Sequence, residues 1–186
     1  MSIESILSDL QKNSDVLSYP IHESSFVSPM NITFSQEVRD ACEANLCGMY
    51  GKCWSCPPGV GRWQDLMEHY REYENAFVYT TVHELEDSYD VDGMNEGRIQ
   101  HVKAEREIEK MLSEQGDAFE ICGAEGCHLC EKCTYPTSPC RHPTLMHHSI
   151  EATGVNVVKL AADCGMHYIN GVNTVTYFSV IYWHKK

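Results

Sequence analysis

The sequence predicts an α+β or α/β fold in which helices pack as a sandwich on a mixed β-sheet that carries two cysteine-rich metal-binding loops. Segments with strand composition alternate with segments of helical periodicity along the chain. The hydrophobic fraction of 42% and the charged fraction of 22% are typical of a globular protein. We find no internal repeat or linker, so we expect one metal-binding domain over residues 1–186, with residues 1–33 as an N-terminal extension packed on it.

The N-terminal third predicts a helix, a strand and a second helix. Apolar side chains recur at helical spacing near the N-terminus: Ile3, Ile6, Leu7 and Leu10. A strand is expected around residues 21–27. In "TFSQEVRDACEAN", Thr33 and Gln36 have the spacing of a capping box, which predicts a helix that carries Cys42 near its C-terminal end.

The remaining elements follow from periodicity and from glycine and proline. "CGMYGKCWSCPPGVG" is expected to be a loop, because its glycines and paired prolines interrupt regular structure. A helix over "RWQDLMEHYREY" and a strand over "AFVYTTV" come next. A long helix is expected from Asn95 to Gln115, and "AFEI" is expected to be a strand that leads into the second cysteine group. A short helix ending at Gly154 and strands over "VNVVKL" and "NTVTYFSVIYW" complete the chain.

The second cysteine group has the spacing of an iron-sulfur site. Cys127, Cys130 and Cys133 recur every three residues, as in the Cys-x-x-Cys-x-x-Cys run of bacterial ferredoxins. Structural zinc sites more often use two separated Cys-x-x-Cys pairs, so this spacing favours iron and sulfur over zinc.

Three cysteines are candidates for the fourth ligand of this group. We favour Cys140, because the loop "TYPTSP" is long enough to fold back and its prolines limit the entropy lost on folding. Cys122 lies nearest upstream. Cys56 is followed by proline, as in the cross-ligation of ferredoxins, and would serve only if the two loops meet in space.

The first cysteine group is more open to interpretation. It comprises four residues: Cys42, Cys47, Cys53 and Cys56. Four thiolates within fifteen residues suit a second cluster or a tetrahedral zinc ion. If only three of them bind a cluster, one iron keeps an open position at which a small-molecule substrate can coordinate.

Residues around the two groups have other expected roles. The isolated Cys164 is expected to be a small hydrophobic residue rather than a ligand. His142 is a candidate for a hydrogen bond from its imidazole to a cluster sulfur. Trp54 and Tyr50 are expected to pack within the first loop, or to exclude water from its site.

Charge and hydropathy exclude several classes of partner. The net charge of −13 argues against a nucleic-acid partner, and no segment has the ~20 consecutive apolar residues of a membrane span. The N-terminus "MSIESILSDLQKNSDVL" lacks the features of a signal peptide, so we expect a cytoplasmic protein with reduced thiols. No nucleotide-binding motif is present, so electrons are expected from a ferredoxin-like or flavin partner.

Three segments resemble a widespread prokaryotic family of predicted metal-binding proteins of unknown function. They are "GKCWSCPP", "CHLCEKCTYPTSPCRHP" and "SIEATGVNVV", and the resemblance covers residues 42–183. It implies that the metal ligands are Cys42, Cys47, Cys56, Cys127, Cys130, Cys133 and Cys140. Cys53 and Cys122 look like additions to the family pattern, and the resemblance implies no particular reaction.

Together these patterns predict an iron-sulfur protein with two cysteine-bound clusters of the 4Fe-4S type, which serves in electron transfer or in the reduction of a small molecule. The alternative is a zinc-binding module without enzyme activity, in which two structural four-cysteine sites present a surface to another protein.

Overall fold

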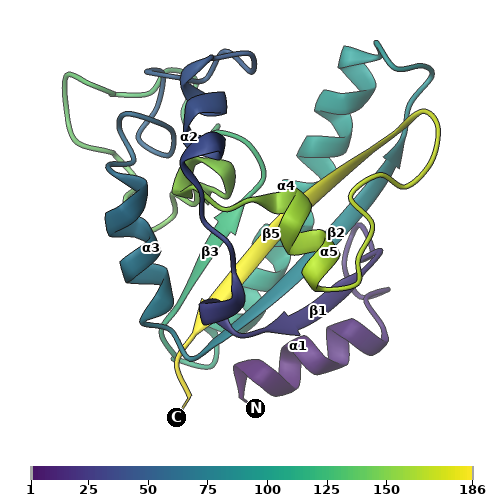
Figure 1. Ribbon diagram of the computed structural model, residues 1–186. Helices are drawn as coiled ribbons and strands as arrows, with labels where there is room; N and C mark the ends of the chain where they lie inside the picture. The colour runs from purple at the N-terminus through teal and green to yellow at the C-terminus, as the bar shows by residue number, and fades with distance from the viewer. Residues whose placement is uncertain (1, 186) are drawn as a thin grey trace.

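The computed structural model describes residues 2–185 and shows the α+β fold that the sequence predicts (Figure 1). The first and last residues of the predicted domain, 1 and 186, lie outside the described residues. The helices are α1 (Ile3–Lys12), α2 (Gln36–Glu43), α3 (Trp63–Arg71), α4 (Val91–Ser113) and α5 (Val157–Asp163). The strands are β1 (Ser24–Val27), β2 (Asn75–Glu84), β3 (Phe119–Gly123), β4 (His148–Ser149) and β5 (Thr174–Trp183). Short 3-10 helices span Pro29–Asn31 and Glu151–Thr153.

The five strands form one mixed sheet in the order β1-β2-β5-β3-β4. Neighbouring strands are antiparallel except for β3 and β4, which are parallel. The long strands β2 and β5 pair over ten residues and form its centre, with Val78 opposite Val180. The C-terminal strand therefore lies between strands that precede it by about a hundred and about sixty residues, which local sequence patterns do not reveal.

Helices cover both faces of the sheet, so the molecule has three layers (Figure 1). Alternate residues of β2 point to opposite faces, as the two-residue period of a strand requires. Phe77 packs with Leu7 of α1 and Ile108 of α4 on one face. Val78 lies on the other face, in a core that includes Leu160 of α5.

Two elements differ from the sequence prediction. Residues 155–160, expected to form a strand, instead lead into helix α5, because the side chain of Asn156 accepts the N–H of Lys159 and caps the first turn. The predicted capping box at Thr33 is also wrong. Helix α2 begins at Gln36, with Ser35 at the N-cap and no side-chain cap hydrogen bond.

Apart from Cys42, the two cysteine groups lie in the irregular segments where the sequence placed them. We call residues 44–62, between α2 and α3, the first cysteine loop, and residues 124–147, between β3 and β4, the second cysteine loop. The two loops lie at the same end of the molecule, beside α2 (Figure 1). Cys42 is in α2 itself, one residue before its end, as predicted.

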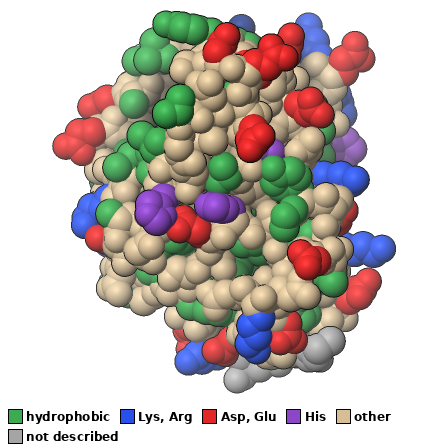
Figure 2. All heavy atoms as spheres, turned by 90° about the vertical axis from the view of Figure 1, so that its right-hand side faces the viewer, with side chains coloured by type: hydrophobic (Ala, Val, Ile, Leu, Met, Phe, Trp, Pro, Cys, Tyr) green, Lys and Arg blue, Asp and Glu red, His purple; other side chains and the backbone are tan. Residues whose placement is uncertain are grey.

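The surface carries the acidic excess of the sequence. On the face shown in Figure 2, acidic side chains are spread among apolar and neutral ones, and no single basic patch dominates. Within residues 2–185, none of the helices combines the length and the apolar character that crossing a bilayer would take.

Candidate metal centre

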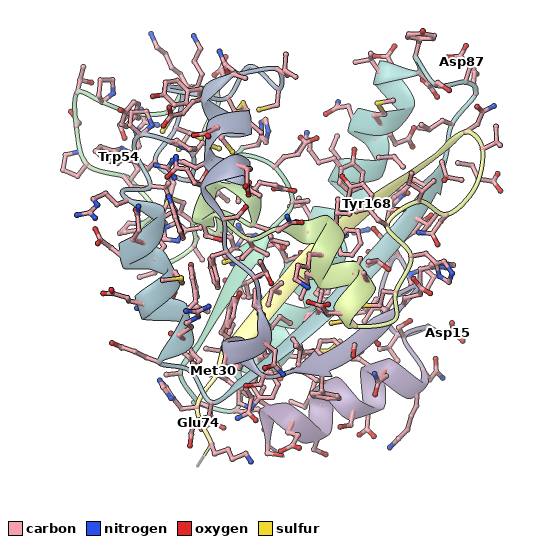
Figure 3. All side chains as sticks on the ribbon, viewed as in Figure 1. Asp15, Met30, Trp54, Glu74, Asp87 and Tyr168 are labelled. Carbon is pink, nitrogen blue, oxygen red and sulfur yellow. The ribbon has the colours of Figure 1, made fainter. Side chains whose placement is uncertain are left out.

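Aromatic side chains hold the two cysteine loops together. The indole Nε1 of Trp54, in the first loop, donates to the carbonyl oxygen of Ser138 in the second at 3.1 Å. The ring of Trp54 meets that of Tyr135 edge to face, with centroids 4.9 Å apart. Gly59 allows this approach, since a Cβ there would lie 2.7 Å from the Cys53 carbonyl oxygen and 2.9 Å from the Tyr135 ring. Figure 3 shows Trp54 at this end of the molecule.

The second cysteine group lines one small cavity. Its walls include all four predicted ligands: Cys127, Cys130, Cys133 and Cys140. Each of these side chains is half-buried. Trp54 of the first loop also lines the cavity, so the contact between the loops shields the thiols from one side.

Backbone N–H groups point at sulfur atoms of this cavity. The N–H of Tyr135 donates to Cys133 Sγ at 3.5 Å. The N–H of His142 donates to Cys140 Sγ at 3.4 Å. In both bonds the donor lies two residues after the cysteine. Such bonds stabilise negative charge on sulfur and are one of the ways in which proteins tune thiolate-bound clusters. The contact from His142 to sulfur that the structure shows is therefore made by its backbone.

In the first cysteine group, Cys53 and Cys56 form a buried pair. Their exposed fractions are 1% and 5%. The hydrogen bond from the Cys56 thiol lowers the pKa of Cys53, although burial opposes the shift, and the same bond raises the pKa of Cys56. Ser55 Oγ lies 3.2 Å from Cys53 Sγ and adds a second hydrogen bond. The two thiols are therefore hydrogen-bonded neighbours.

The other two cysteines of the first group are Cys42 and Cys47. Burial, followed by the charges of Glu151 and Cys47, raises the pKa of the half-buried Cys42 to about 11. Cys47 is exposed, and its charge also contributes to the raised pKa of Cys56. Electrostatic interactions therefore connect Cys42 to Cys47, and Cys47 to the buried pair through Cys56.

The two cysteine groups are direct neighbours. The N–H of Cys127 donates to Ser55 Oγ at 2.7 Å, which joins the second loop to the buried pair of the first. Gly126 packs on the same pair, since a Cβ there would lie 3.1 Å from Cys56 Sγ and 2.5 Å from the Met49 side chain. The condition set for Cys56 as a shared ligand, that the loops meet, is fulfilled.

The donor set fits a metal that prefers thiolates. Soft sulfur ligands select zinc or iron-sulfur clusters over hard cations such as magnesium or calcium. Within residues 2–185, however, no three His, Cys, Asp or Glu side chains already have their donor atoms arranged around a common metal position. The assignment of the eight cysteines as ligands therefore stays a prediction.

Two further cysteines lie away from the cavity. Cys122 is fully buried in β3, where burial raises the pKa of its thiol and Tyr70 is its hydrogen-bond partner. Cys164 follows the last turn of α5 and packs against the core. Both positions suit core residues, and Cys140 is the candidate fourth ligand that lies with Cys127, Cys130 and Cys133.

Sequence reasoning missed Ser55, Gly126 and the pair of Glu105 and His147. Ser55 stands between two cysteines in "CWSCPP", which was a usable signal. Glu105 is 2% exposed, and a carboxylate in the middle of a helix gives no sequence sign of its buried partners.

Comparison with known proteins gives one match. A family model described as "Predicted metal-binding protein (DUF2284)" matches residues 25–182, which is most of the chain. No curated protein and no solved structure matches.

Proposed function

Since the chain belongs to this family of predicted metal-binding proteins, we propose that it is an iron-sulfur protein with two cysteine-bound centres. Each centre is of the 4Fe-4S type, and together they serve in electron transfer or in the reduction of a small molecule.

The cavity in the second cysteine loop carries the proposal. Four thiols line it, three of them at the Cys-x-x-Cys-x-x-Cys spacing of ferredoxins. Backbone N–H groups donate to the sulfurs of Cys133 and Cys140, as they do to sulfur ligands in iron-sulfur proteins. We assign this centre to Cys127, Cys130, Cys133 and Cys140.

The first centre is assigned to the other four cysteines: Cys42, Cys47, Cys53 and Cys56. The hydrogen bond between the thiols of Cys53 and Cys56 supports Cys53 as a member of this centre. Cys47 is the exposed position of the group. A small-molecule substrate would therefore approach this centre from the side of Cys47.

The residues between the centres have roles of their own. A bound cluster supplies one-electron chemistry that the side chains alone lack. Trp54, which packs against the ring of Tyr135, lines the cavity of the second cysteine loop and limits access of water to it. Ser55 and Gly126 fix the distance between the two cysteine groups.

A ferredoxin-like or flavin protein is the proposed electron partner. The net charge of −13 suits docking onto a basic surface, which would make association fast at low salt and slower as salt screens the attraction.

Cys130→Ser tests the assignment of the second centre. Cys130 lines the cavity with the three other thiols, so its replacement removes one of four ligands. We expect loss of about four of about eight iron atoms per chain, measured with acid-labile sulfide after anaerobic purification.

Cys164→Ala is the matched control, because Cys164 is a cysteine outside both groups. It should leave iron and sulfide unchanged. Unchanged metal in Cys130→Ser would show that the cavity is not the site.

A further inference from the structure

A continuous chain of buried polar side chains runs between α4 and the central strands. His83 Nε2 and His101 Nδ1 both lie 2.8 Å from Thr81 Oγ1. His101 Nε2 lies 2.8 Å from Ser179 Oγ, which donates to Glu105 Oε2 at 2.6 Å. All five residues are buried, and Thr81, His101 and Ser179 are fully so.

The carboxylate of Glu105 sets the direction of these hydrogen bonds. Because Ser179 gives its only proton to Glu105, it must accept one from His101 Nε2. Burial lowers the pKa of His101 to about 4, so its ring is neutral and its Nδ1 accepts from Thr81. This series of hydrogen bonds therefore stabilises the ionised carboxylate of Glu105 inside the protein.

His147 approaches the same carboxylate from the second cysteine loop. Its Nδ1 lies 2.6 Å from Glu105 Oε1, and its Nε2 lies 3.1 Å from Glu109 Oε1 and 3.0 Å from Arg106 Nη1. Burial by itself would lower the pKa of His147, but its hydrogen bonds to Glu105 and Glu109 outweigh burial and raise it. The two carboxylates thus favour the protonated form of His147.

This pair borders the second cysteine group. Glu105, His147 and Cys127 line one cavity between α4 and the start of the second cysteine loop. The carboxylate lies against the backbone that leads to Cys127, since a Cβ on Gly123 would come within 2.6 Å of Glu105 Oε2. Because Cys127 lines the same cavity as Glu105 and His147, a change of charge at the cysteine group would act on the pair.

We propose that Glu105 and His147 form a proton-loading site for the centre at Cys127, Cys130, Cys133 and Cys140. This inference rests on the proposed function. When one electron enters the centre from a ferredoxin-like or flavin donor, or from dithionite in vitro, one proton from solvent binds Nε2 of the neutral form of His147, whose new N–H then donates to Glu109 Oε1. The added negative charge raises the proton affinity of His147, and no other bond forms or breaks.

The titratable groups that line the cavities around His147 determine its pKa before the electron enters. Helix α4 contributes Arg98, Glu105, Arg106 and Glu109, and the second cysteine loop contributes Glu125, Cys127 and His128. The remaining groups are Tyr70 of α3, Glu120 of β3 and the neighbouring His148. Arg106 opposes protonation of His147, and Glu105 and Glu109 favour it. We therefore expect proton uptake by His147 to be coupled to reduction at pH values above the ordinary histidine pKa of 6.5.

Potentiometric titration of the cluster-loaded protein at a series of pH values tests this. If one proton is taken up with each electron, the midpoint potential falls by up to ~59 mV for each unit rise in pH, because one pH unit is a tenfold change in proton concentration. We expect this slope above pH ~6.5 in the wild type and its loss in His147→Gln. His69→Gln is the control. It removes a histidine that also pairs with a glutamate, Glu120 at 2.9 Å, but that lies on α3 outside the cavity.

The outcomes separate the two claims. A redox couple whose potential is independent of pH in the wild type, or whose slope survives in His147→Gln, overturns the proton-loading site and leaves the proposed function intact. A protein with no redox couple overturns both. A slope that His147→Gln abolishes and His69→Gln preserves supports the inference.

Discussion

Ser55 is the residue at which the two cysteine loops are joined. Its hydroxyl oxygen accepts the N–H of Cys127 at 2.7 Å and lies 3.2 Å from Cys53 Sγ. Its carbonyl oxygen accepts the N–H of Ser149 at 3.3 Å, and the side chain is fully buried. A single small polar residue thereby links both cysteine groups to the sheet.

Ser55→Ala should destabilise the protein and loosen the second loop. The substitution leaves the N–H of Cys127 without its acceptor, which costs about 1–3 kcal/mol of the free energy of unfolding. Urea unfolding of the metal-free protein measures this cost. Ser138→Ala is the control, because Trp54 bonds to the backbone carbonyl of Ser138 and not to its side chain. Equal stability of the two variants would contradict the role of Ser55.

At the level of residues, the spacing of the cysteines in the sequence was sufficient to divide them into two candidate metal-binding groups. The three-residue repeat of Cys127, Cys130 and Cys133 is visible in any reading of the sequence. The contact of Ser55 with Cys127 joins positions 72 residues apart, and it depends on how both loops fold. No local pattern carries that information.

Helix α5 shows how a cap outweighs composition. "VNVVKL" is rich in valine, which favours strands, and this led to the prediction of a strand. Buried Val157, Leu160 and Ala161 nevertheless follow the spacing of one helical face. Asn156 Oδ1 accepts the N–H of Lys159 at 2.9 Å and starts the helix. The preference of valine was overridden by the cap and by packing on the core.

Asn156→Ala should therefore weaken the protein at this element. Loss of an N-cap costs about 0.5–2 kcal/mol of the free energy of unfolding, which thermal or urea unfolding detects. Asn156→Asp retains an acceptor oxygen and should stay close to the wild type. The metal content should be unchanged in both, because α5 lies outside the two cysteine loops. An alanine variant as stable as the aspartate variant would contradict the capping role.

For the whole molecule, alternating periodicity was sufficient to predict helices on a mixed sheet. The order of the strands was not predictable, because β5 inserts between β2 and β3 through contacts distant in sequence. This order, with α2 and α3 on one face, brings the loop after α2 and the loop after β3 to the same end (Figure 1). The juxtaposition of the cysteine groups is thus a property of the fold.

The central claim is that these neighbouring groups bind iron-sulfur clusters. The most direct test is to purify the wild-type protein anaerobically, record its visible absorption spectrum, and count iron, zinc and acid-labile sulfide per chain. We predict a brown protein with about eight iron and about eight sulfide per chain, as two 4Fe-4S clusters require. A colourless protein with about two zinc ions and no labile sulfide would contradict the claim, and would make both groups structural zinc sites.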